Sequence, residues 1–136
     1  MNAKQWLGRE RFIDRELKAL KREKQKKLDD LTKITQSYES DGAQMTKDPH
    51  KFDRLVEIEN MIDQKVDELI DTKKEITAII FKLDDRNQKL VLISYYLRMM
   101  TLEKIAVEMN YSFRQIVNIR RHGIMEVQKL INCNNL

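Results

Sequence analysis

Apolar residues recur at helical spacing in two long segments of this chain, from Lys4 to about Ile34 and from His50 to about Leu83. Spacings of three, four and seven residues place these side chains on one narrow stripe of each helix. Such a stripe cannot bury itself, so it requires a partner helix. The sequence therefore predicts a long antiparallel helical hairpin with coiled-coil-like packing. The stripes comprise Trp6, Ile13, Leu17, Leu20, Leu28, Leu31 and Ile34, and then Leu55, Ile58, Ile62, Val66, Leu69, Ile76, Ile80 and Leu83.

The two segments carry opposite charge. Residues 1–34 contain 11 Lys/Arg and 6 Asp/Glu, a net charge of +5, whereas residues 50–85 contain 6 and 10, a net charge of −4. Opposite flanking charges favour the pairing of two helices and help to set their register. The pairing can occur within one chain or between two chains, so a homodimer through these N-terminal helices is an alternative that periodicity does not exclude.

Composition limits the fold class. Only three glycines and one proline occur in 136 residues, which leaves little room for the turns of β-hairpins, so we expect an all-α chain. Residues 35–49 are polar and hold a glycine and the only proline, and they predict a loop. We therefore expect a helical hairpin over residues 1–84 and a separate domain over residues 85–136.

Cysteine content, apolar runs and histidine spacing indicate the compartment and the cofactor chemistry. A single cysteine, Cys133, rules out an intramolecular disulfide and suits a reducing cytoplasm. No apolar run approaches the ~20 residues of a membrane span, and the N-terminus lacks the apolar core of a signal peptide. His50 and His122 have no nearby Cys or His at metal-ligand spacing. We therefore expect a cytoplasmic protein that is no enzyme, contacts no membrane and uses no metal or cofactor.

The Lys-rich run KALKREKQKK, residues 18–27, has the composition of a nucleic-acid patch. Three acids, Glu16, Glu23 and Asp29, interleave with it. Because mixed signs are typical of a solvated helix face, we interpret the run as the outer surface of its helix.

The stretch from Thr101 to Ile131 predicts two helices joined by a very short turn. Thr101 is a suitable N-cap for the first helix. Asn110 suits the turn because asparagine is the non-glycine residue that best tolerates a left-handed conformation. Ser112 restarts the helical pattern, and Gln115 three residues later completes a capping box. The recognition helix is expected over about residues 112–131.

A third helix is expected before these two. Asp85 and Gln88 form another capping pair, and the run RNQKLVLISYYLR follows. The three helices together predict a compact unit, in which the preceding helix packs across the other two. Its expected core residues are Leu90, Val91, Ile93 and Leu97, with one ring each from Tyr95 and Tyr96.

The second helix of the pair has an apolar and a polar side. Ile116, Ile119, Gly123, Val127 and Leu130 fall along one stripe, whereas Arg114, Asn118, Arg121 and Met125 face the opposite way, with Gln115 and His122 beside them. A small residue at Ala106, a left-handed turn at Asn110 and a branched apolar residue at Ile116 match the layout of a helix-turn-helix. The alternative is an ordinary helical hairpin whose polar face is merely solvated.

The run LVLISYYLRMMTLEKIAVEMNYSFRQIVNIRRHGI resembles the region of bacterial sigma factors that reads the −35 promoter element. With the helical N-terminal half and the opening NAKQWL, the chain resembles the RinA/ArpU-type transcriptional regulators of phages and prophages. The resemblance implies binding of double-stranded DNA, control of phage genes, late ones among them, and a bacterial host cell. In this chain Asn110 stands where the pattern usually has glycine, and Met99-Met100 replaces a glycine-containing link.

The resemblance places base and phosphate contacts just after the cap of the recognition helix. Together with the outward polar face, it gives the expected DNA-binding residues Ser112, Phe113, Arg114, Gln115, Asn118, Arg120, Arg121 and His122. Two other functions stay open at this point. The chain could be an interaction module that docks on RNA polymerase or on another partner through the hairpin, or a phage DNA-packaging subunit.

Overall fold

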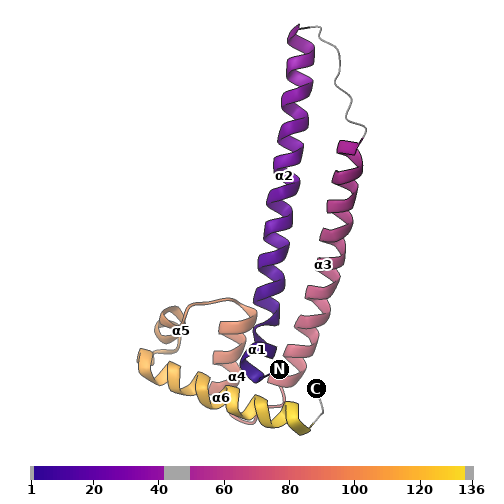
Figure 1. Cartoon of the computed structure of the whole chain (residues 1–136). Coiled ribbons are helices and arrows are strands. Elements are labelled where there is room, and N and C mark those ends of the chain that lie inside the picture. The colour runs from indigo at the N-terminus through magenta and orange to yellow at the C-terminus, as the bar shows by residue number, and fades with distance from the viewer. Residues whose placement is uncertain (1, 42–49, 134–136) are drawn as a thin grey trace. The chain divides into compact units, whose positions relative to one another are not determined.

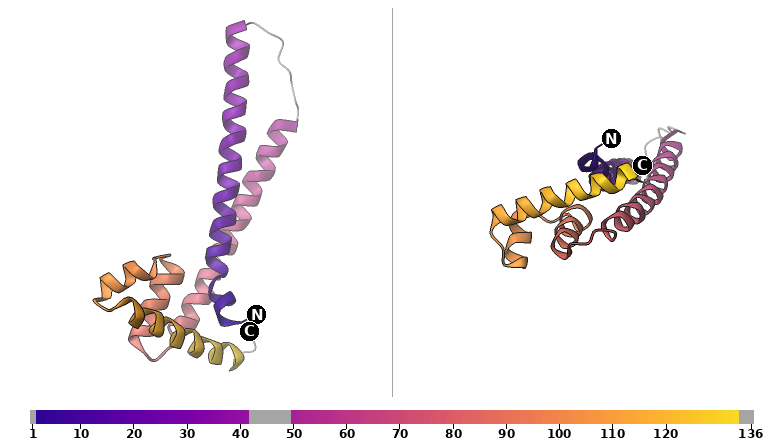
Figure 2. Two further views of the ribbon diagram at one scale, coloured as in Figure 1. Left: turned by 60° about the vertical axis from the view of Figure 1, so that its left-hand side comes forward. Right: turned by 90° about the horizontal axis from the view of Figure 1, so that it is seen from below.

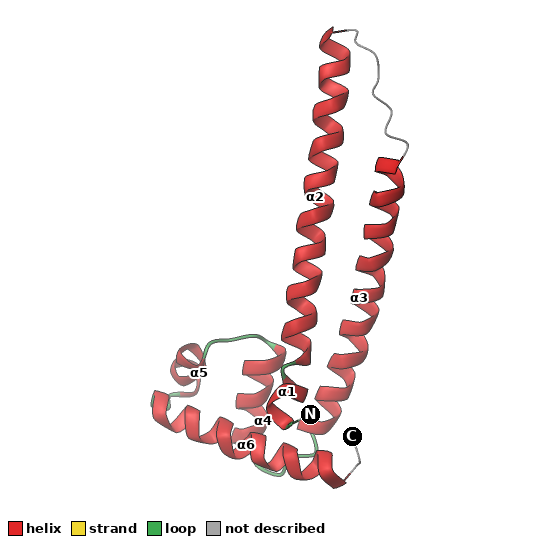
Figure 3. Ribbon diagram, viewed as in Figure 1, coloured by secondary structure: helices red, strands yellow, loops and turns green. Residues whose placement is uncertain are grey.

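The computed structural model of the chain describes residues 2–41 and 50–133. Every regular element in this part is helical, so the expected all-α fold is confirmed (Figures 1 and 3). The elements are α1 (Ala3–Leu7), α2 (Arg9–Asp41), α3 (His50–Ile80), α4 (Arg86–Leu92), the π-helical turn η1 (Ile93–Leu97), α5 (Leu102–Met109) and α6 (Phe113–Cys133). None of these helices has both the length and the apolar character that crossing a membrane requires.

The chain divides into two compact units. Unit 1 combines Met1–Phe12 with Leu69–Leu136, and unit 2 is Ile13–Glu68. This division differs from the expected boundary after residue 84. Both ends of the predicted hairpin, the start of the chain and the end of α3, belong with the C-terminal helices.

In unit 2, α2 and α3 run antiparallel and side by side (Figures 1 and 2). The Lys24 ammonium lies 3.0 Å from the Glu59 carboxylate, and the Lys65 ammonium lies 2.9 Å from that of Glu16. These ion pairs are partly exposed to solvent, and surface pairs of this kind contribute only about 0–1 kcal/mol each. Burial is greatest at the stripe residues Ile13, Leu17, Leu55 and Ile58.

Two expectations for unit 2 need correction. Leu28 was expected on the buried stripe but is 37% exposed, because two helices alone cannot enclose the whole stripe of each. The loop was expected from residue 35, whereas α2 continues to Asp41. No glycine or proline precedes Gly42 in this stretch, so nothing in the sequence stops the helix earlier. Residues 42–49 lie outside the described part of the chain.

Unit 1 is built around α4, which is buried on two sides. Leu92 lies in a first core cluster with residues of α1, α3, η1 and α6, whereas Val91 lies in a second core cluster with residues of α5 and α6. The first cluster comprises Ala3, Trp6, Leu7, Ile76, Ile79, Ile80, Leu83, Leu92, Tyr96, Val127 and Ile131, and the second comprises Val91, Ile105, Ala106 and Ile116.

Because α4 is buried on two sides, its core residues differ from those expected. Leu90 was expected in the core, yet its side chain is 51% exposed. Val91, which was expected in the core with Leu90, Ile93 and Leu97, is fully buried, whereas Leu92 was not among the expected core residues. Because α4 lies between two clusters, the adjacent residues Val91 and Leu92 are the ones fully buried.

The N-terminal residues enter the first core cluster because a break separates α1 from α2. Asn2 and Gln5 form a capping box that starts α1, and Gly8 ends this helix after one turn. Trp6 and Leu7 are then buried in the cluster. The backbone N–H of Ala3 also donates a hydrogen bond of 2.6 Å to the Gln128 side-chain oxygen of α6.

Two backbone features separate α4 from α5. The N–H of Arg98 donates to the carbonyl of Ile93 at 2.9 Å, a bond spanning five residues that defines the π-helical turn. Met99 follows with a φ of +56°. This left-handed conformation costs an L-residue about 1–2 kcal/mol. Met99 stands in the link where the sigma-like pattern commonly has glycine.

Met99→Gly should raise the free energy of unfolding by up to ~1 kcal/mol, because glycine adopts this φ without the penalty and loses part of the gain through greater freedom when unfolded. Met100→Gly is the matched control. Met100 has no positive φ and packs against the second core cluster, so its loss should destabilise. Urea denaturation measures both variants; a destabilised Met99→Gly protein would contradict the expectation.

Candidate nucleic-acid interface

The turn between α5 and α6 is fixed by its own side chains and backbone. The Thr101 hydroxyl accepts from the N–H of Lys104 at 3.3 Å and caps the start of α5. Asn110 ends α5 with φ 58° and ψ 37°, the left-handed conformation expected from the sequence. The N–H of Tyr111 then bonds back to the Ala106 carbonyl at 3.0 Å. Three residues thus reverse the chain between the two helices.

The expected capping box at the start of α6 is present. The N–H of Gln115 donates to the Ser112 hydroxyl at 3.1 Å, and the N–H of Ser112 donates to the Gln115 side-chain oxygen at 2.8 Å. Both side chains are exposed, yet each satisfies a backbone group of the first turn. In this state they order the start of the helix.

Small and branched residues set the crossing of α6 over its neighbours. Ala106 of α5 and Ile116 of α6 are buried together in the second core cluster, as their spacing predicts. Gly123 faces α4: a Cβ at this position would lie 3.1 Å from Leu92 Cδ1. A Cβ here would require the fully buried Leu92 side chain to shift by a few tenths of an ångström, so glycine favours the close approach of α6 to α4.

The opposite side of α6 is open to solvent. Arg114, Asn118, Arg121, His122 and Met125 are all exposed and recur at helical spacing, so they share one outward face. Phe113 is 49% exposed at the start of the helix. No acidic residue occurs between Ser112 and Met125, so the face is positive or neutral throughout. We call the five exposed residues the outward face of α6: Arg114, Asn118, Arg121, His122 and Met125.

Arg120 lies beside the buried stripe of α6 and not on the outward face, and its expected contact with DNA stays a prediction. Its guanidinium donates a hydrogen bond of 3.1 Å to the Tyr96 hydroxyl and lies 4.4 Å from the centre of the Tyr95 ring. Arg11 stacks on the same ring at 4.2 Å. This position follows from the helical spacing, because Arg120 lies four residues after buried Ile116 and three before buried Gly123, on their side of the helix.

The tyrosine pair thereby ties α6 to α2 and η1. The Tyr95 and Tyr96 rings meet edge to face, with centroids 4.8 Å apart. Tyr96 is almost fully buried. Burial raises the pKa of its hydroxyl above the ordinary value of 10.0, and the positive charge of Arg120 opposes this rise only in part.

Tyr96→Phe should lower the free energy of unfolding at neutral pH by ~1–2 kcal/mol, because it leaves the Arg120 guanidinium without its acceptor. The pKa of Tyr96 is higher in the folded state than in the unfolded state, so neutral Tyr96 stabilises the fold fully below about pH 10. This contribution disappears as the pH rises through the folded-state pKa. The difference between wild type and Tyr96→Phe should therefore shrink in alkaline solution. Denaturation series at several pH values measure it, and a constant difference would contradict the assignment.

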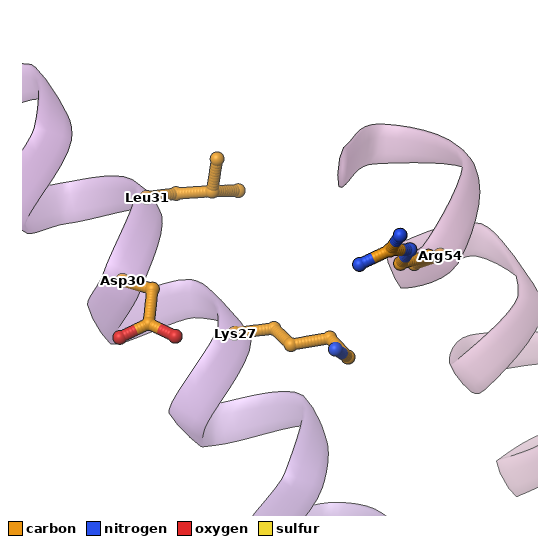
Figure 4. A pocket seen from close by; sticks show the side chains of 4 residues that line it. All are labelled: Lys27, Asp30, Leu31 and Arg54. Carbon is orange, nitrogen blue, oxygen red and sulfur yellow. The ribbon is translucent and has the colours of Figure 1, made fainter. Parts of the chain in front are cut away.

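Two hollows among the described residues are small. One of about 200 Å³ is lined by Lys82, Leu83, Asp84, Asp85, Gln88, Glu126 and Leu130. The other, of about 110 Å³ between α2 and α3, is lined by Lys27, Asp30, Leu31 and Arg54, with Lys27 and Leu31 extending from α2 toward α3 (Figure 4). Pockets for small molecules usually measure about 300–1,000 Å³. Within the same described part, no three His, Cys, Asp or Glu side chains are grouped to hold a metal ion.

The chain matches the model of a protein family. Residues 31–128 match a family described as "Protein of unknown function (DUF1492)", which is more than half of the chain. The match includes α4, α5 and the outward face of α6. No curated protein and no solved structure matches the chain.

Proposed function

Because the chain belongs to the DUF1492 family, whose description states no function, we propose one from the residues themselves. The protein is a sequence-specific regulator of transcription that binds double-stranded DNA, with α6 as the recognition helix. The observation that carries the proposal is the outward face of α6, which is positive or neutral, exposed, and presented by a helix whose start is fixed by a left-handed turn and a capping box.

The size and chemistry of α6 suit the major groove. This groove is about 12 Å wide and accepts one α-helix. Arg114 can donate two hydrogen bonds to guanine, and Asn118 one turn later can bond adenine through both its donor and its acceptor. Arg121 lies farther along the helix and is suited to a phosphate. Phe113 can make an apolar contact with a thymine methyl group.

A rigid support favours specific reading over loose attachment. The buried face of α6 extends through both core clusters, from Ile116 to Ile131. Gly123 and the Arg120–tyrosine contacts fix its position against α4 and η1. Side chains on a helix held in this way keep a defined register relative to the bases, which specificity requires.

The resemblance to RinA/ArpU-type regulators extends the proposal to its biological setting. It implies that the regulated genes are those of a phage or prophage, late genes among them, in the cytoplasm of a bacterial host. By the same likeness to sigma factors, RNA polymerase is a second partner for the DNA-bound protein.

Selection of bound fragments from a pool of random duplex DNA tests the proposal. The full-length protein should enrich a common short motif, and the motif should persist when the selection is repeated at higher salt. Base contacts resist salt better than phosphate contacts, because only the latter release counterions. Enrichment without a shared motif would mean that the protein binds DNA without sequence specificity. No enrichment at all would exclude DNA as the partner.

A further inference from the structure

A row of exposed cations follows the side of α2 that faces away from α3. Arg15, Arg22, Lys26 and Lys33 are all exposed, and their spacing of seven, four and seven residues keeps them on one side of the helix. Arg15 lies about half a turn from buried Ile13, whose side chain is on the stripe toward α3. We call these four residues the outer stripe of α2.

Two of the acids that interleave with these cations in the sequence are paired with lysines off the outer stripe. The Glu16 carboxylate is paired with Lys65 of α3, and that of Glu23 with Lys27 one turn along α2. The Asp29 carboxylate accepts a hydrogen bond of 2.9 Å from Gln25. The neutral Gln25 amide leaves the Asp29 charge in place, and Asp29 and Asp30 lie one helical turn from both Lys26 and Lys33. The mixture of signs therefore reaches Lys33 but does not extend to the part of the outer stripe from Arg15 to Lys26.

The stripe cations, by contrast, lack carboxylate partners. In the described part of the chain, no acidic side chain lies within ion-pair distance of Arg15, Arg22, Lys26 or Lys33. Three of these cations, Arg15, Arg22 and Lys26, form a line of positive potential about 17 Å long on one side of the helix, from 11 residues at ~1.5 Å each. That length corresponds to about five base pairs of duplex at ~3.4 Å per step.

We propose that the outer stripe of α2 is a second DNA-binding surface, which contacts the phosphate backbone without reading sequence. This inference rests on the proposed function, since it gives one chain a sequence reader in α6 and a backbone contact in α2. Between Arg15 and Lys26 the apolar content of this side of α2 is limited to the small Ala19, whereas the cores of protein–protein interfaces are apolar and depleted of charge. Interfaces with DNA are strongly positive and polar. A lipid surface fits less well, because α2 turns its apolar stripe toward α3.

Neutralising part of the stripe in the full-length protein tests the proposal. Arg15→Gln/Arg22→Gln/Lys26→Gln keeps helix propensity nearly constant and removes three charges. On a mixed-sequence duplex of about 40 base pairs, the slope of log K against log salt should fall in magnitude by about 2–3 units, at ~0.9 per lost phosphate contact. Circular dichroism should show unchanged helix content.

A charge-matched control separates the stripe from net charge. Lys4→Gln/Lys74→Gln/Lys82→Gln removes three exposed cations off the stripe that have no ion-pair partner among the described residues. It should leave the slope nearly unchanged, as should Arg15→Lys/Arg22→Lys, which keeps the charge. Equal slopes for the stripe variant and the wild type would overturn the proposal.

Further measurements separate a failure of the stripe proposal from a failure of the proposed function. If the wild type prefers one motif but the stripe variant keeps its salt slope, the stripe proposal fails while α6 remains the reader. If the wild type binds no duplex at all, the proposed function fails with it. Light scattering measures whether each protein is a monomer or a dimer. If the wild type is a dimer, the stripe variant is a monomer and the salt slope of the variant is unchanged, the stripe binds a second copy of the chain. That result would overturn the proposed DNA contact.

Discussion

Replacing Trp6 by alanine is expected to lower the free energy of unfolding by about 3–5 kcal/mol, the usual cost of deleting a large buried aromatic side chain. Trp6 is only 6% exposed and lies in the first core cluster, which also holds the end of α3 and the second half of α6. Its loss leaves a cavity between elements that are distant in the sequence. Thermal and urea denaturation, followed by circular dichroism, measure the effect.

Phe12→Ala is the matched control for this substitution. Phe12 is also an aromatic residue of the N-terminal segment, but its side chain is 65% exposed. Its removal should change the free energy of unfolding by no more than ~0.5 kcal/mol, as for most surface substitutions. Similar costs for the two variants would mean that the N-terminal segment is not part of the core of unit 1.

The second large effect concerns base selectivity. Arg114→Ala and Asn118→Ala should each weaken binding to the preferred motif by about 1–3 kcal/mol, and each should relax selectivity at one or two base positions. Both side chains are exposed on the outward face of α6, one turn apart. Neither is used by the fold, so both variants should melt like the wild type. Binding to preferred and scrambled duplexes at two salt concentrations gives the selectivity directly.

Arg121→Ala provides the comparison. Arg121 is exposed on the same face but farther from the start of α6. If it meets a phosphate, its loss should weaken preferred and scrambled duplexes alike and reduce the salt slope by about one unit. An unchanged ratio of preferred to scrambled binding in both Arg114→Ala and Asn118→Ala would show that α6 does not read the bases.

Arg120 and Arg121 show that residue type alone does not predict the direction in which a helical side chain points. Both arginines were expected to contact DNA, and they are adjacent in the sequence. Yet one residue of helix rotates a side chain by about 100°. Arg121 therefore remains exposed, whereas Arg120 stacks on Tyr95 and bonds Tyr96. Arg120→Ala should accordingly act on stability before it acts on DNA.

Local chemistry was determined by the sequence alone. The caps at Asp85, Thr101 and Ser112 and the left-handed turn at Asn110 all occur where they were expected. Each depends on residues within four positions of one another, whose hydrogen bonds form whenever a helix starts or ends there. The all-α class follows from the same local rules together with helical periodicity.

The tertiary structure decided which of the helical residues lie together. It placed Trp6 and Leu7 with the C-terminal helices, although the boundary expected after residue 84 separated them. It buried Leu92 as well as the expected Val91 and left Leu90 exposed, because α4 is covered on two sides. Periodicity describes only one helix at a time, so it states that a stripe needs cover without stating which element covers it. That choice depends on the packing of segments far apart in the chain, which only the folded structure contains.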